Sequence, residues 1–177
     1  MNVLLNDSSV LLNLLAADCI ASIADATGWQ FAICPAVCDE VKELRDTNTG
    51  EMVEVNIAPL IASGLLQMLE LSGDEEQTLY VEQSIVVDDG EAMSIAIAAS
   101  RHLELAIDDK QAANHMRRTF PKIRIWSTPD ILKQWADDGL VDASVLREAI
   151  HLIEIRARYF PPKSHALAAW WGAMKEG

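Results

Sequence analysis

The chain has 177 residues, of which 50% are hydrophobic, and this suits one domain with a substantial core and excludes a disordered chain. The sequence holds no apolar run long enough for a membrane-spanning helix, and no basic region opens it as in a signal peptide. The net charge of −13 argues against a protein that coats nucleic acid non-specifically.

The charge is unevenly distributed along the chain. Residues 1–100 carry 2 basic and 17 acidic side chains, a net of −15, whereas residues 101–177 carry 12 basic and 10 acidic side chains, a net of +2. A basic segment without any acid follows residue 109, with Lys110, Arg117, Arg118, Lys122 and Arg124. Binding of phosphate and an ordinary solvated helix face both explain this segment.

Short apolar runs alternate with helical patterns along most of the chain. The patterns predict strands over residues 2–7, 28–34, 64–71, 103–109 and 122–128, with a weak strand within a loop at 46–58. They predict helices over residues 8–26, 35–44, 72–85, 88–100, 110–120 and 129–138, and two more in 140–177, separated by Pro161 and Pro162. This alternation is typical of an α/β domain in which helices cover both faces of a parallel sheet.

Three cysteines occur, an odd number with no second pair to complete a zinc site. Small buried apolar side chains are the simplest interpretation of Cys19, Cys34 and Cys38. Unpatterned cysteines fit a reducing compartment, so we expect a cytoplasmic protein.

Acidic residues follow the predicted strands at the places where a parallel sheet binds ligands. Asp7 ends the first strand, Asp108 and Asp109 end the strand at 103–109, and Glu91 lies in the first turn of the helix before that strand. Glu40 lies on the helix after the second strand. Carboxylates that converge either protonate or bind a cation, and oxygen ligands favour Mg²⁺ or Mn²⁺. Hydrolysis of phosphodiester bonds is the reaction that best uses such a site.

Each acid taken alone also has a structural explanation. Asp88 and Glu91 have the spacing of a capping box, in which the two residues satisfy each other's backbone amides. Asp109 and Asp7 are positioned to cap helices, and Glu40 fits a solvated helix face. The hypothesis of a metal site therefore depends on the set.

The set of motifs resembles that of the PIN domain, a family of metal-dependent nucleases. "LLNDSSVLLNLL" resembles the first motif with Asp7, and "CPAVCDEVKEL" the second with Glu40. "DDGEAMSIAIAA" resembles the third in its D-x-G-E form with Glu91, and "LELAIDDKQAANHM" the fourth with Asp109. The resemblance covers about residues 1–140, which we take as a PIN-like nuclease domain, and leaves 141–177 as a helical extension packed on it.

The resemblance implies a three-layer, Rossmann-like α/β/α fold with a mainly parallel sheet. It implies a ribonuclease whose Mg²⁺ or Mn²⁺ is held by catalytic ligands Asp7, Glu40, Glu91 and Asp109. Many relatives are toxins of toxin–antitoxin pairs, so an antitoxin and a second copy of the chain are expected partners besides RNA, and a membrane is not. Lys110, Arg117 and Arg118 are the candidates for contact with the RNA backbone.

A second hypothesis is a PIN-like module that binds a partner protein and cuts little or nothing. The tail carries Tyr159, Phe160, Trp170 and Trp171, and either helix packing or an interface explains them. The complete set of four acids favours the nuclease. A Ser or Cys hydrolase is disfavoured, because no G-x-S-x-G occurs.

Overall fold

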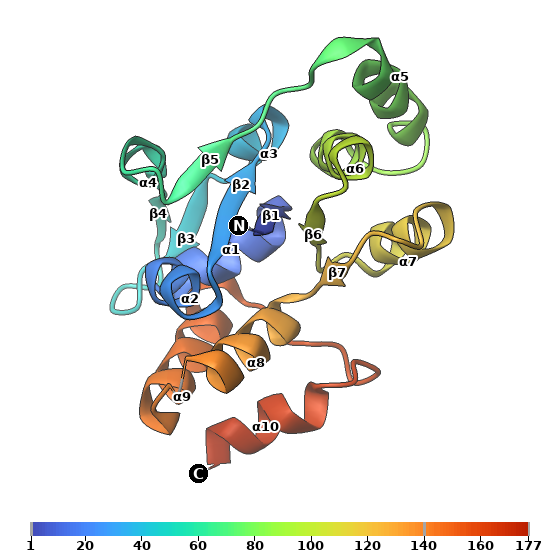
Figure 1. Ribbon diagram of the computed structural model, residues 1–177. Helices are drawn as coiled ribbons and strands as arrows, with labels where there is room; N and C mark the ends of the chain where they lie inside the picture. The colour runs from blue at the N-terminus through green and yellow to red at the C-terminus, as the bar shows by residue number, and fades with distance from the viewer. Residues whose placement is uncertain (1, 140, 177) are drawn as a thin grey trace.

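A parallel five-stranded sheet with strand order β5-β2-β1-β6-β7 forms the centre of the protein (Figure 1). The structure is a computed structural model that describes residues 2–139 and 141–176. In the central strand, Leu4 lies opposite Phe31 of the neighbouring strand on one side and opposite Glu104 of the neighbouring strand on the other. The strands are β1 (Asn2–Asn6), β2 (Trp29–Ile33), β5 (Leu66–Met68), β6 (Glu104–Ala106) and β7 (Ile125–Trp126).

Helices cover both faces of this sheet, as the sequence predicts (Figure 1). One face carries α1 (Ser8–Ala16), α2 (Ile20–Thr27) and α8 (Thr128–Asp138), and α8 packs on the other two. The opposite face carries α6 (Asp89–Arg101) and α7 (Lys110–Thr119), with α3 (Pro35–Glu40) and α5 (Gly73–Gln83) packed against α6. The short helix α4 (Ala58–Ala62) lies beside the edge strand β5. The α/β/α fold class is confirmed.

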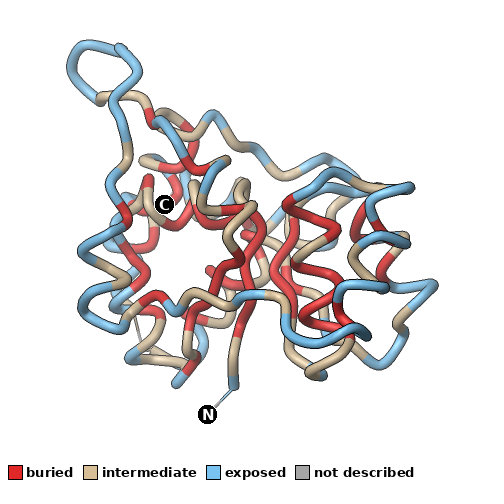
Figure 2. The backbone as a smooth tube through the Cα atoms, turned by 90° about the horizontal axis from the view of Figure 1, so that it is seen from above, coloured by how far each residue is buried: buried red, intermediate tan, exposed pale blue. Residues whose placement is uncertain are grey.

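The strands are buried on both faces, which explains their nearly continuous apolar sequences. Leu4, Leu5, Phe31, Ile33 and Leu105 have no solvent exposure. Figure 2 shows the buried segments in the strands and the inner sides of the flanking helices, with exposed segments along the outside. The helix α6 is almost wholly buried from Gly90 to Ala99, so its small residues allow close approach to the sheet.

The single helix predicted over residues 8–26 is wrong, because the structure has two helices there. The first, α1, ends at Ala16, and Asp18 adopts a left-handed backbone conformation with φ 52°. The second helix then leaves at 103° to the first. This bend lets α2 pack on β2 and α8, an arrangement that the helical spacing of apolar residues does not encode. The N-cap of α1 is Asp7, one of the capping positions that the sequence indicates.

The helix predicted over residues 35–44 is also too long. It ends at Glu40, and Leu44 lies in β3 (Glu43–Arg45), which pairs antiparallel with β4 (Met52–Glu54). Leu44 is buried in this hairpin, so its apolar character reflects packing of a strand. The weak strand expected within 46–58 corresponds to β4.

The C-terminal segment forms α9 (Ala143–Leu152), a π-helical turn η1 (Ile153–Ala157) and α10 (Ala168–Glu176). Two helical units therefore lie on either side of Pro161 and Pro162, as predicted; Leu140 and Gly177, at the ends of that predicted range, lie outside the described residues. Trp171 is buried, and its indole Nε1 donates a hydrogen bond of 2.9 Å to Glu154. The η1 turn packs on α1 and β3, so the tail joins the main body directly.

No single helix among the described residues is long and apolar enough to cross a membrane. The helices α1 and α2 reach the required length and composition only as a pair, across their sharp bend.

Candidate functional site

The chain direction of β1 and β6 brings two acidic segments to the same edge of the sheet. The Asp7 amide continues the β1–β6 pairing and donates a hydrogen bond of 2.9 Å to the Ala106 carbonyl. Asp108 and Asp109 follow the end of β6 after one residue, Ile107. The sequence prediction that Asp7 lies beside the acids after β6 is therefore confirmed by the register.

Asp7 is a buried carboxyl at the start of α1, with 5% of its surface exposed. Ser8 and Ser9 donate hydrogen bonds to it, at 3.3 and 2.5 Å. Burial raises the pKa of Asp7 to about 6, the serine hydrogen bonds oppose this rise, and the charges of Asp108 and Asp88 add to it. The carboxyl thus lies in a place where its charge is costly without a cation.

Glu91 does not form the capping box that its spacing allows. The Asp88 carboxylate accepts a hydrogen bond of 2.9 Å from the Glu91 amide, which is the first half of the motif. The second half, from the Glu91 side chain to the Asp88 amide, is not formed. Burial raises the pKa of Glu91 to about 8, and the nearby charges of Asp88, Asp7 and Asp109 contribute in that order. Glu91 therefore lies within the electrostatic reach of both strand-end acids.

Glu40 reaches the same helix from the end of α3. A Cβ atom added to Gly90 would lie 2.5 Å from Glu40 Oε1 and 2.7 Å from Oε2, so the carboxylate occupies the space that a side chain at 90 would need. Gly90 immediately precedes Glu91 in α6. The structure thereby brings Glu40, Glu91, Asp7 and Asp109 to one region.

The neighbours Asp108 and Asp109 have different surroundings. Asp108 accepts hydrogen bonds from the Thr128 amide at 2.9 Å, the Thr128 hydroxyl at 2.6 Å, Asn13 at 3.0 Å and Tyr159 at 3.1 Å. Burial raises its pKa despite these bonds. Asp109 is exposed and accepts only the helix-capping hydrogen bond from Ala112, at 2.7 Å, among the described residues. Asp109 is therefore the one of the two that is free to bind an ion.

The donor set fits a hard divalent cation in its chemistry. All four candidate ligands are carboxylates, and two of them, Asp7 and Glu91, have raised pKa values that a cation would lower. The Asn6 Oδ1 atom, one residue before Asp7, is buried without a hydrogen-bond partner among the described residues. Within residues 2–139 and 141–176, no three Asp, Glu, His or Cys side chains are already arranged around one point as a metal requires. The side chains must therefore turn inward to bind an ion.

The basic residues of α7 are only partly near this site. Lys110 begins the helix beside Asp109 and is exposed. Arg117 and Arg118 lie in the last turn, roughly 10–12 Å further along the helix axis, and both donate hydrogen bonds to Asn114. Contact of these three residues with RNA remains a prediction.

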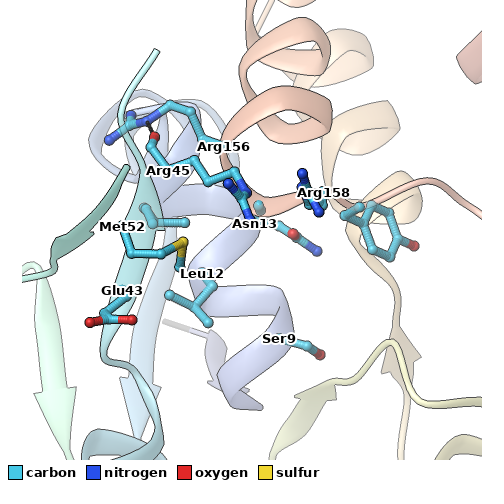
Figure 3. A pocket seen from close by; sticks show the side chains of 11 residues that line it. Ser9, Leu12, Asn13, Glu43, Arg45, Met52, Arg156 and Arg158 are labelled. Atoms are coloured by element: carbon cyan, nitrogen blue, oxygen red, sulfur yellow. Dashed lines mark hydrogen bonds between the residues drawn. The ribbon is translucent and has the colours of Figure 1, made fainter. Parts of the chain in front are cut away.

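A basic pocket that the sequence did not indicate lies between α1, β3 and η1. It has a volume of about 320 Å³, and Figure 3 shows Arg45, Arg156 and Arg158 at its walls with Ser9 and Asn13 from α1. Arg156 in η1 and Arg158 directly after it are close in the sequence, whereas Arg45 in β3 is 111 positions away from Arg156. A cluster of this kind leaves no local sequence signal, apart from the basic balance of residues 101–177.

Comparison with known proteins supports the motif-based assignment. A family model described as DUF3368, a PIN domain, matches residues 3–168 and thus also most of the C-terminal segment. No curated protein and no solved structure matches the chain significantly. PIN domains are generally nucleases and typically use divalent metal ions. The match spans nearly the whole sequence, and the chain therefore belongs to the PIN domain family.

Proposed function

We propose that the protein is a metal-dependent endoribonuclease that hydrolyses RNA phosphodiester bonds at the carboxyl edge of the sheet. The observation that carries this proposal is the position of Asp7: its buried carboxyl follows β1, and its amide donates a hydrogen bond of 2.9 Å to the Ala106 carbonyl, just before the acids that follow β6. Burial, which raises the pKa of Asp7 to about 6 and that of Glu91 to about 8, supports it. A bound Mg²⁺ or Mn²⁺ supplies a water of lowered pKa and offsets charge on the phosphoryl group.

Each carboxylate has a separate role in this proposal. Asp7 and Asp109 would hold the ion from the segments that follow β1 and β6, and Glu91 and Glu40 would complete the set from α6 and α3. Ser8 and Ser9 hold Asp7 in one orientation through their hydrogen bonds. Asp88 caps α6 and so fixes the backbone that carries Glu91.

The cellular role follows from the family resemblance. We propose a toxin of a toxin–antitoxin pair that acts in the cytoplasm, with an antitoxin protein and a second copy of the chain as partners. The alternative is a catalytically weak or inactive PIN-like module that binds a partner protein.

A cleavage assay separates the nuclease from the interaction module. The protein is stripped of metal with a chelator, supplied with Mn²⁺ or Mg²⁺, and incubated with a panel of single-stranded RNAs. We expect cleavage by the wild type and by Asp25→Asn, a matched change at an exposed acid on α2, and a loss of at least about 100-fold with Asp7→Asn. Failure of the wild type on the whole panel, or equal cleavage by Asp7→Asn, contradicts the proposal.

A further inference from the structure

The pocket between α1, β3 and η1 combines a basic side with an apolar one. Arg45, Arg156 and Arg158 line it together with a single acid, Glu43, which gives a local net charge of +2 in a chain of net charge −13. Leu12 and Met52 lie on the wall between these groups in Figure 3. A nucleotide presents the same combination, because its phosphate is anionic while the faces of its base and ribose are largely apolar.

The pocket is connected to the strand-end acids by hydrogen bonds from three of its lining residues. Ser9 donates to Asp7 at 2.5 Å, and Asn13 and Tyr159 donate to Asp108 at 3.0 and 3.1 Å. One layer of side chains therefore separates the pocket from the carboxylates.

Two of the arginines are held by hydrogen bonds to backbone carbonyls, and each guanidinium keeps further N–H donors for a ligand. Arg156 donates to the Ala16 carbonyl at 2.6 Å and to the Arg45 carbonyl at 3.3 Å, and Arg45 donates to the Gly50 carbonyl at 2.9 Å. A guanidinium has five N–H donors, so these bonds occupy only part of each group. The two side chains are thus oriented in advance for an anion.

Arg158 is the exposed member of the cluster and has an unusual backbone. It follows the π-helical turn η1 with φ 56° and ψ 31°, a left-handed conformation that is costly for arginine. Both π-helical turns and such strained residues concentrate at functional sites. Arg158 is for this reason the residue of the pocket most suited to test.

We propose that this pocket is a subsite for a nucleotide of single-stranded RNA beside the cleaved bond, with the backbone phosphate on Arg158 and Arg156. The proposal rests on the proposed nuclease function and adds the residues that hold its substrate. Leu12 and Met52 pack against the ribose or base, and Ser9 marks the side on which the chain continues to Asp7.

Binding of labelled RNA without metal tests this subsite apart from cleavage. Fluorescence anisotropy with a single-stranded RNA in chelator is measured over a range of salt concentrations for wild type, Arg158→Gly, Arg158→Lys and Lys163→Ala. Glycine accepts the left-handed backbone, so Arg158→Gly is expected to fold, which the thermal midpoint checks. Lys163→Ala removes the same charge from an exposed position between η1 and α10.

We expect Arg158→Gly to weaken binding about fivefold or more and to lower the slope of log K against log salt by about 0.7, the value for one phosphate contact on a single strand. Arg158→Lys should recover most of the slope, and Lys163→Ala should keep it. If Arg158→Gly loses the same affinity for a DNA strand of equal sequence, Arg158 contacts the phosphate and not the ribose 2′-hydroxyl. An unchanged slope for Arg158→Gly, or an equal loss for Lys163→Ala, overturns the subsite. If Arg158→Gly loses RNA binding but the wild type cleaves no RNA, the proposed RNA-binding subsite stands and the proposed nuclease function is refuted.

Discussion

The Glu40 carboxylate lies in the space that a side chain on Gly90 would occupy, 2.5 Å from the position of its Cβ. This relationship joins α3 to the first turn of α6, beside Glu91. The glycine of the D-x-G-E sequence is therefore required because a side chain there would clash with Glu40. Its backbone conformation does not require glycine, since φ of Gly90 lies outside the left-handed region. The Glu40 carboxylate can take this position only because residue 90 has no side chain.

Replacement of Gly90 by alanine should therefore separate metal binding from stability. The clashing atoms are the end of a flexible side chain, so Glu40 should turn away while the fold persists. Alanine in a helix adds up to about 1 kcal/mol of stability relative to glycine. We expect an unchanged or raised thermal midpoint and Mn²⁺ affinity about tenfold lower by calorimetry. Gly172→Ala in α10, where a Cβ has no neighbour within 4 Å, is the control and should leave Mn²⁺ affinity unchanged. Equal Mn²⁺ affinity of Gly90→Ala and wild type would exclude Glu40 from the site.

Asparagine substitutions at the consecutive acids Asp108 and Asp109 should differ in their effect on stability. Asp108 accepts four hydrogen bonds from α1, α8 and the tail, and an asparagine amide would face donors there. We expect Asp108→Asn to lower the free energy of unfolding by about 2–4 kcal/mol, measured with urea. Asp109→Asn keeps the α7 cap, because asparagine caps as well as aspartate, and should change stability by less than about 0.5 kcal/mol.

Metal titrations of the same two variants complete this comparison. Folded Asp108→Asn should bind Mn²⁺ with near wild-type affinity, whereas Asp109→Asn should bind it at least about tenfold more weakly. The reverse pattern would assign the ligand to Asp108.

The metal-free protein should lose stability as the pH rises. The pKa values of Asp7 and Glu91 are raised in the fold, from 3.8 to about 6 and from 4.5 to about 8, so the fold favours their protonated forms. The resulting stability is complete below the unfolded values and is lost as the pH passes the folded ones. We expect the thermal midpoint in chelator to fall by several degrees between about pH 5 and about pH 8. In the double variant Asp7→Asn, Glu91→Gln the thermal midpoint should depend much less on pH. An equally steep dependence would refute the titration of Asp7 and Glu91 as its cause.

The sequence was sufficient to predict the acids at the sheet edge. Apolar runs that end in Asp7 and Asp109 lie in parallel strands, and parallel strands end on the same side. The sequence left two interpretations of Glu91 open, because a capping box and a site at the sheet edge need the same residues at the same spacing. Only the fold shows that Asp88 caps α6 while the Glu91 carboxylate is not used in return.

Features that depend on long-range packing were not predictable. Asp108 is held by Thr128, Asn13 and Tyr159, which are 20, 95 and 51 positions away, so nothing beside it indicates its role. Arg45 and Arg158 likewise meet only because η1 packs on β3. The bend at Asp18 has the same cause, since the apolar spacing continues through it and the packing of α2 on α8 sets the direction.

Asp7 and its neighbouring carboxylates are expected to bind a divalent cation, which a calorimetric titration of the metal-free protein with Mn²⁺ measures directly. The titration is done at about pH 8, where Asp7 is ionised and about half of the Glu91 carboxyls are ionised before the ion binds. We expect saturable binding by the wild type and by Asp25→Asn, and affinity at least about tenfold lower in Asp7→Asn. No saturable binding by the wild type, or equal affinity in Asp7→Asn, would contradict the account.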